Sequence, residues 1–215
     1  MTTHSLKNKR ILITCGPTWV PIDDVRVISN RSTGALGQAL ARNLAKAGAK
    51  VTVLEGPVLR PLEVPGVRIV KYQFFHELFL LMRQECRKKY HAVIHAAAIS
   101  DFQLKARFKE KISSGRRKLK LELVPTPKII ESIKEWAPKT CLVGFKLETR
   151  LTNKDLPRIA RAMAQNCGCD LVLANTSSTN AYKGYVLSPD GTVLARQNSR
   201  AEIARSLQKI LGQRL

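Results

Sequence analysis

Several features that would assign a function class are scarce or absent in this sequence of 215 residues. Aromatic residues make up only 6% of it, and we find no helix-turn-helix, zinc-finger or aromatic RNA-binding pattern. No apolar run approaches the ~18 residues of a membrane helix. The first ten residues lack the apolar region of a signal peptide. We therefore expect a cytoplasmic protein without a membrane partner.

Cysteine is present in an odd number, and its spacing gives no metal motif. Most of the five cysteines lie in or beside apolar stretches, which is typical of buried, reduced thiols. Cys167 and Cys169 are too close in sequence for the usual pair of zinc ligands, and there is no second pair. The metal ligands, if the protein has any, stay unknown from the sequence.

Two catalytic patterns are missing as well. There is no G-x-S-x-G motif, so a hydrolase with a nucleophile elbow is excluded. Short-chain dehydrogenases need a tyrosine with a lysine four residues later, and none of the four tyrosines here has one.

Positive charge, by contrast, is in excess. The sequence has 37 Lys and Arg against 16 Asp and Glu, a net charge of +21, which attracts polyanions such as phosphorylated small molecules or nucleic acid. Residues 102–120, "FQLKARFKEKISSGRRKLK", concentrate this charge. We expect them to form a basic lid that closes over phosphates. Ser113-Ser114-Gly115 indicates a mobile first part, and the alternation over 118–123 predicts a half-buried strand.

The order of apolar segments predicts the fold class. Strand-like and helix-like segments alternate, which favours a Rossmann-like α/β fold with a mainly parallel sheet and helices on both faces. Pro189-Asp190-Gly191 predicts a C-terminal β-hairpin, and Ser199 with Glu202 predicts the cap of a last helix. Thr126 is expected to cap a helix that opens at Pro127. We expect a single domain over 1–215. The strands are predicted at 10–15, 50–55, 67–70, 91–96, 141–145 and 170–175, and the other helices at 34–47, 74–89 and 153–166.

The stretch 29–56, "SNRSTGALGQALARNLAKAGAKVTVLEG", resembles the start of a nucleotide-binding domain. Glu55 follows Gly34 by 21 residues, about where an acidic residue binds the ribose of NAD. However, 18 residues separate Cys15 from Gly34, far more than a dinucleotide-binding turn requires. From these residues alone, an NAD(P)-dependent oxidoreductase, an anion-handling ligase and a basic nucleic-acid-binding protein all remain open.

A set of motifs in order along the chain narrows the choice. "ILITCGPT", "PIDDVRVISNRSTGALG", "AAAISDF", "EKISSG", "GFKLET" and "DLVLAN" together resemble the phosphopantothenoylcysteine synthetase (phosphopantothenate–cysteine ligase) family, in its form without a flavin-dependent decarboxylase. The resemblance implies coenzyme A biosynthesis: 4'-phosphopantothenate and cysteine are joined through an acyl-nucleotidylate, at the expense of CTP or ATP. It also implies Mg²⁺, no flavin, a homodimer, and only non-specific contact with nucleic acid.

The resemblance also implies roles for particular residues. Asn30, Arg26 and Lys111 would be catalytic, with Lys111 also meeting the nucleotide. The other implied nucleotide-binding residues are Gly16, Ser32, Gly34, Ala98, Asp101, Phe145 and Asn175.

Purely structural roles compete with these assignments. Asn30 and Asp101 could instead be caps, Arg26 could pair with Asp23 or Asp24, and Phe145 could be core. His91 and His95 are expected to be structural.

Two departures leave the nucleotide open. Bacterial members of the family usually carry Lys-Ile-Lys-Lys in the lid and use CTP, whereas this sequence has "KISS" at 111–114. They usually have Asn-Pro-Asp where this sequence has "TPK" at 126–128, closer to the eukaryotic branch, which favours ATP.

Overall fold

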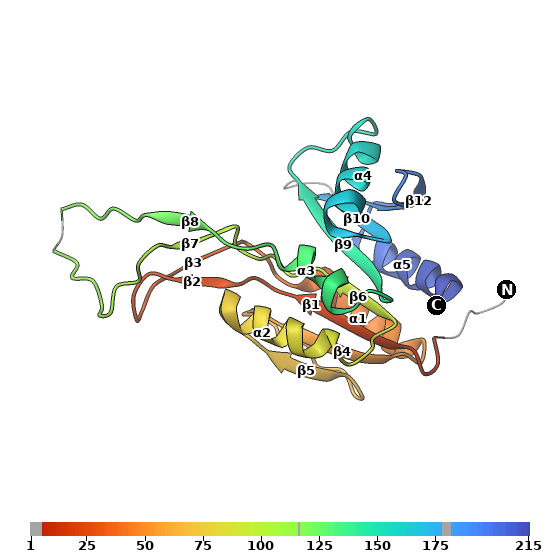
Figure 1. Cartoon of the computed structure of the whole chain (residues 1–215), viewed down its shortest axis with the longest axis horizontal. Coiled ribbons are helices and arrows are strands. Elements are labelled where there is room, and N and C mark those ends of the chain that lie inside the picture. The colour runs from red at the N-terminus through yellow and green to blue at the C-terminus, as the bar shows by residue number, and fades with distance from the viewer. Residues whose placement is uncertain (1–5, 116, 178–181) are drawn as a thin grey trace.

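The computed structural model describes residues 6–115, 117–177 and 182–215. Its centre is an eight-stranded sheet in the order β12-β11-β10-β9-β6-β1-β4-β5 (Figure 1). The parallel strands are β1 (Arg10–Cys15), β4 (Lys50–Glu55), β5 (Arg68–Lys71), β6 (Ala92–His95), β9 (Cys141–Glu148) and β10 (Leu171–Ser177). The antiparallel strands are β11 (Tyr182–Leu187) and β12 (Val193–Gln197). The predicted fold class is confirmed, including the C-terminal hairpin.

Two apolar layers explain why the chain takes this fold. Leu40 of α1 (Ala35–Lys46) and Leu207 of α5 (Arg200–Arg214) are fully buried in the layer on one face of the sheet. On the other face, α2 (Phe75–Cys86), α3 (Ile129–Trp136) and α4 (Asp155–Cys167) bury Leu78, Ile133 and Ile159. Central strands such as β1 are covered on both faces, so they read as continuous apolar runs rather than alternating ones.

A long arm projects from the carboxyl end of the sheet (Figure 1). Two antiparallel pairs form its base: β2 (Trp19–Pro21) with β3 (Val27–Ser29), and β7 (Phe102–Leu104) with β8 (Leu123–Pro125). We call residues 105–115 and 117–122, which join β7 to β8 and lie toward its tip, the strap. The expected lid is thus the outer part of a built arm, with residue 116 outside the described part.

Two local predictions are wrong. Residues 118–122 form no strand, and Leu119 and Leu123 are 42% and 44% exposed, because no layer of this chain covers them. Thr126 does not cap α3, which begins at Ile129; its hydroxyl instead donates to the carbonyl of Ser100 at 2.7 Å. The cap of α5 is confirmed, since Ser199 accepts from the amide of Glu202.

The structure agrees with the expectation of buried, reduced cysteines. All five cysteines are free thiols; Cys15, Cys86 and Cys169 are buried, and Cys141 and Cys167 are partly buried. Burial raises the pKa of the Cys15 thiol to about 12. Among the described residues, no helix is both long enough and apolar enough to cross a membrane.

Candidate functional site

Glycines let three chain segments meet closely at the carboxyl ends of β1 and β4. Gly16 and Gly34 have φ angles of +82° and +70°, which side chains rarely adopt. A Cβ on Gly37 would lie 2.4 Å from Cys15 Cβ, and a Cβ on Gly56 would lie 2.2 Å from the Pro17 oxygen. The loop before α1 is therefore held against the strand ends, in the place where open α/β sheets bind ligands.

Asn30 joins this loop to the segment after β6. Its Nδ2 donates to the carbonyl oxygens of Ala98 at 3.2 Å and Ile99 at 3.0 Å. The residue before α1 is Gly34, whose amide donates to Ser32 Oγ at 3.4 Å. The alternative that Asn30 caps the helix is therefore wrong.

Glu55 does not offer a free carboxylate to a ribose. The side chain is fully buried and accepts from Gln38 Nε2 at 2.8 Å and from the Leu62 amide at 3.0 Å. It also forms an ion pair with Lys71. Glu55 thus fastens the loop after β4, and the sequence argument for a dinucleotide site loses its main residue.

A cleft of about 410 Å³ opens beside these strand ends, lined by residues at the ends of β6 and β9 and by α3 and α4. Asp101 lines it, is exposed, and makes no side-chain hydrogen bond within the described residues, so a capping role finds no support. Phe145 lines the same cleft and also packs against the core, so its structural alternative is present, and its contact with a base stays a prediction.

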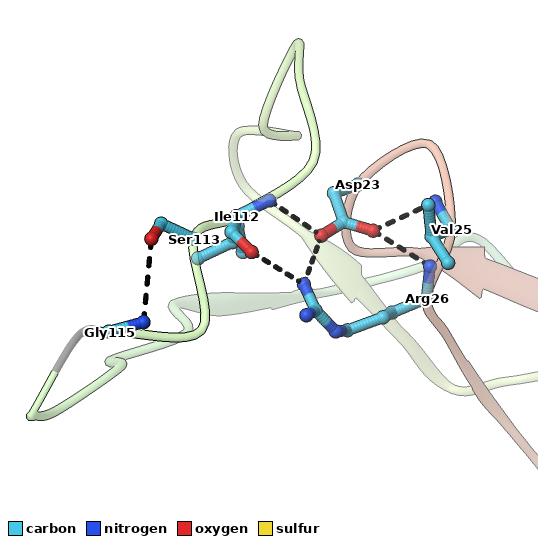
Figure 2. A network of polar contacts seen from close by, with 6 residues as sticks. All are labelled: Asp23, Val25, Arg26, Ile112, Ser113 and Gly115. Atoms are coloured by element: carbon cyan, nitrogen blue, oxygen red, sulfur yellow. Dashed lines mark hydrogen bonds and ion pairs between the residues drawn. The ribbon is translucent and has the colours of Figure 1, made fainter.

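The strap is fastened to the β2–β3 turn by Asp23 (Figure 2). Asp23 Oδ1 accepts from the amides of Val25 and Arg26 at 2.9 and 2.7 Å. Oδ2 accepts from the amide of Ile112 at 3.0 Å and from Arg26 Nη1 at 2.6 Å. These donors, the Ile112 amide above all, hold the pKa of the Asp23 carboxyl well below its ordinary value.

Arg26 closes the same network, because its Nη1 also donates to the Ile112 carbonyl at 3.2 Å. The structural alternative for Arg26, an ion pair with Asp23, is therefore present. Ile112 itself is 6% exposed, whereas its neighbour Lys111 is exposed, so the backbone beside Lys111 is fixed while its ammonium is not.

We expect Asp23→Asn to loosen the strap with little effect on the sheet. The asparagine amide nitrogen would replace one of the two accepting oxygens and would face N–H donors there. Either the bond from the Ile112 amide or the bonds from the turn amides would then be lost. Hydrogen exchange of a peptide over 107–115 should quicken clearly. Asp24→Asn is the matched control, because Asp24 also contacts the strap, through Arg107, but in an exposed ion pair of the kind that contributes little. Equal exchange in the two variants would show that Asp23 does not hold the strap.

Comparison with known proteins identifies the family to which the chain belongs. The family of the DNA/pantothenate metabolism flavoprotein C-terminal domain matches residues 6–214. The chain belongs to this family. The motif resemblance drawn from the sequence is thereby confirmed.

A curated relative matches the chain along nearly its whole length. The coenzyme A biosynthesis bifunctional protein CoaBC of Thermococcus kodakarensis is 37% identical over 212 residues, which are 98% of this chain and 51% of that protein. The chain thus spans about half the length of this curated relative.

Solved structures extend the comparison. The DNA/pantothenate metabolism flavoprotein from Streptococcus pneumoniae superposes with a TM-score of 0.86 at 29% identity, over 96% of this chain and 100% of that one. The C-terminal domain of CoaBC gives 0.79 at 27% identity, over 99% and 98%.

The sequence-predicted site residues form three groups, and Asn175 lies apart from them. Gly16, Ser32 and Gly34 lie at the end of β1, where Asn30 holds the backbone of Ala98. Asp101 and Phe145 line the cleft. Asn175 lies near the end of β10, paired with Leu147 and Gly184, and does not line the cleft. Arg26, drawn in Figure 2, lies just before β3 on the arm, and Lys111 belongs to the strap.

The wall of the cleft was missed from the sequence. Met163 and Cys167 of α4 line it, together with Lys128 and Ile130 near the start of α3. No motif pointed to α4. The one signal was Gly144 in "GFKLET", since a Cβ there would lie 2.5 Å from Met163 Cε, so that glycine lets this side chain of α4 pack closely on β9.

Proposed function

We propose that this chain, as a single synthetase domain over 1–215, is a phosphopantothenate–cysteine ligase of coenzyme A biosynthesis. The observation that carries the proposal is the family match over 6–214. The relative from Thermococcus kodakarensis, named for coenzyme A biosynthesis, matches over nearly this whole chain. The convergence of the motif glycines, Asn30 and Asp101 at neighbouring strand ends supports it.

The proposed reaction has two steps and needs no protein nucleophile. A carboxylate oxygen of 4'-phosphopantothenate attacks the α-phosphorus of a nucleoside triphosphate and displaces pyrophosphate, giving the acyl-nucleotidylate. The amine of cysteine then attacks the acyl carbon and displaces the nucleoside monophosphate, with loss of a proton. Both steps depend on positioning and on neutralising phosphate charge. The loop at Ser32 and Gly34, which leads into the N-terminus of α1, offers amide donors of the kind that bind phosphate.

The described part of the site offers carboxylate groups, rather than a complete set of protein ligands, to a divalent cation. Within residues 6–115, 117–177 and 182–215, no three His, Cys, Asp or Glu side chains cluster to hold a metal. Mg²⁺ commonly binds one or two carboxylates and takes its other ligands from substrate phosphates and water. We propose Asp101, exposed in the cleft, as the carboxylate that would hold Mg²⁺ there, where the ion would neutralise phosphate charge. The proposed reaction transfers no electrons and uses no flavin.

A second copy of the chain is the proposed partner of the arm. Among the described residues, half of the ten large exposed apolar side chains lie on the arm, at Val25, Val27, Phe102, Leu119 and Leu123. A concentration of large exposed apolar side chains on one part of a molecule is typical of an interaction surface. We propose a homodimer in which the arm covers its apolar residues against the partner and brings the strap of one copy near the cleft of the other.

The remaining partners follow from the reaction. The triphosphate is CTP or ATP, and the location is the cytoplasm, where both are present. The net charge of +21 serves these small anions, so nucleic acid binds only non-specifically and the binding fades as salt rises.

An omission series tests the proposed function. With phosphopantothenate, Mg²⁺ and either CTP or ATP, the chain should release pyrophosphate; formation of the amide should require cysteine as well. Hydride transfer to or from NAD(P) without pyrophosphate release would refute the ligase and restore the oxidoreductase.

A further inference from the structure

Thr14 and His95 form a buried polar pair at the ends of the two central strands β1 and β6. The two residues are register partners, and they are 0% and 6% exposed. Thr14 Oγ1 lies 3.1 Å from His95 Nδ1. The amide of Ala97 donates to the same oxygen at 3.1 Å.

This arrangement defines which ring nitrogen carries the proton. The Ala97 amide can only donate, so Thr14 Oγ1 accepts there and keeps its own proton to give. His95 Nδ1 can accept that proton's hydrogen bond, and a neutral imidazole then carries its hydrogen on Nε2. If Nδ1 donated instead, the buried hydroxyl proton of Thr14 would have no acceptor among the described residues, which is costly. Burial also lowers the pKa of His95 to about 4, so the ring is neutral at pH 7.

The Nε2–H group faces the cleft. His95 lines the cleft, and no hydrogen bond of Nε2 occurs within the described structure. Among those residues, the buried side-chain nitrogen and oxygen atoms without a partner are Thr140 Oγ1 and Tyr182 Oη. Nε2 is not one of them, so it keeps access to the cleft space.

The surroundings indicate what this donor meets. The buried part of the cleft lining is His95 with Ile129 and Ile159, whereas Lys128 and Arg158 are exposed. An apolar floor with one neutral donor suits a flat, uncharged ring that carries an acceptor atom. The exposed cations suit phosphates.

We propose that His95 contacts the nucleotide, its Nε2–H donating a hydrogen bond to an acceptor atom of the nucleobase, and that Thr14 is the positioning residue that fixes the ring's tautomer. The identity of the ligand rests on the proposed function; the pairing of Thr14 with His95 does not. From the sequence, His95 is expected to be structural; contact with a nucleobase gives it a second role.

Binding measurements with matched variants test the proposal. His95→Gln can keep an amide donor near the Nε2 position, whereas the shorter side chain of His95→Asn cannot. By calorimetry, His95→Asn should bind its preferred nucleotide, CTP or ATP, roughly tenfold more weakly than the wild type, and His95→Gln within about threefold, as expected for one hydrogen bond. Tripolyphosphate, which has no base, should bind all three proteins equally. Equal nucleotide affinities, or an equal loss for tripolyphosphate, would overturn the contact with the base.

A spectroscopic measurement on the wild type and two Thr14 variants tests the positioning role. The nitrogen-15 spectrum of the His95 ring should show the Nε2–H tautomer in the wild type and in Thr14→Ser, and a mixture in Thr14→Val. An Nδ1–H tautomer in the wild type would overturn the role of Thr14.

The binding tests use no phosphopantothenate and therefore do not depend on catalysis. If the chain binds nucleotide but releases no pyrophosphate in the omission series, the proposed ligase function is refuted and the contact of His95 with the base is not. Binding of neither nucleotide refutes both proposals.

Discussion

Lys111→Gln is expected to form the acyl-nucleotidylate roughly 10²–10³-fold more slowly than the wild type, the loss typical of removing one transition-state donor. Negative charge grows around the α-phosphorus as the carboxylate attacks. An ammonium group that approaches stabilises this charge more strongly in a closed site with little water than in solvent. Lys111 is suited to such an approach, because the bond from Ile112 to Asp23 fixes the backbone beside an exposed side chain.

Rapid-quench measurement of the first step checks this expectation. Lys109→Gln is the matched control: it removes the same charge from an exposed residue of the strap, and should mainly weaken nucleotide binding at low salt. Equal losses in the two variants would mean that the strap acts only as a basic surface.

The arm geometry adds a second check on Lys111. Lys111 does not line the cleft of its own chain. If the strap serves the partner's cleft, mixing the Lys111→Gln chain with an Asn30→Asp chain should restore activity that neither has alone. Absence of restoration in verified mixed dimers would place Lys111 over its own cleft.

Asn30→Asp should leave the first step largely intact and slow the attack of cysteine by roughly 10²-fold. The amide group of Asn30 donates to the carbonyls of Ala98 and Ile99, and an aspartate there would set a carboxylate against two carbonyl oxygens. The new charge also lies near the loop at Ser32 and Gly34 that we propose to bind phosphate, so we expect the acyl-nucleotidylate to be held in a displaced position and to accumulate.

Quenched samples analysed for the intermediate measure this directly. Ser29→Ala is the control, because the exposed Ser29 hydroxyl only donates to the neighbouring Asn30 carbonyl. Cysteine attack at the wild-type rate in Asn30→Asp would reduce Asn30 to a structural tie between two loops.

The sheet could be predicted from the sequence because its strands are buried on both faces and therefore leave continuous apolar runs, as in β1 and β10. The arm could not. Its strands are three residues long, and the alternation over 118–123 indicates two unlike sides without saying what covers either. Among the described residues nothing covers Leu119, and the strand begins only at Leu123, where β8 pairs with β7.

The candidate site, like the fold, was predictable from the sequence only in part. Motifs located the strand-end residues Gly34, Asn30 and Asp101, because close backbone approach and charge leave distinctive residue types. The contribution of α4 could not be predicted, because Met163 and Cys167 are ordinary helix residues in the sequence. Only the folded structure shows that they line the cleft. Glu55 misled for the opposite reason: its spacing matched a ribose ligand, while its carboxylate is already occupied by Gln38 and Leu62.

The measurement that tests the central claim most directly follows the carboxylate oxygen of phosphopantothenate. With oxygen-18 in that carboxylate, the bridging oxygen of an acyl-nucleotidylate leaves with the nucleotide when cysteine attacks. The account predicts oxygen-18 in the nucleoside monophosphate and none in pyrophosphate. Oxygen-18 in inorganic phosphate, released together with a nucleoside diphosphate, would show an acyl phosphate instead and contradict it.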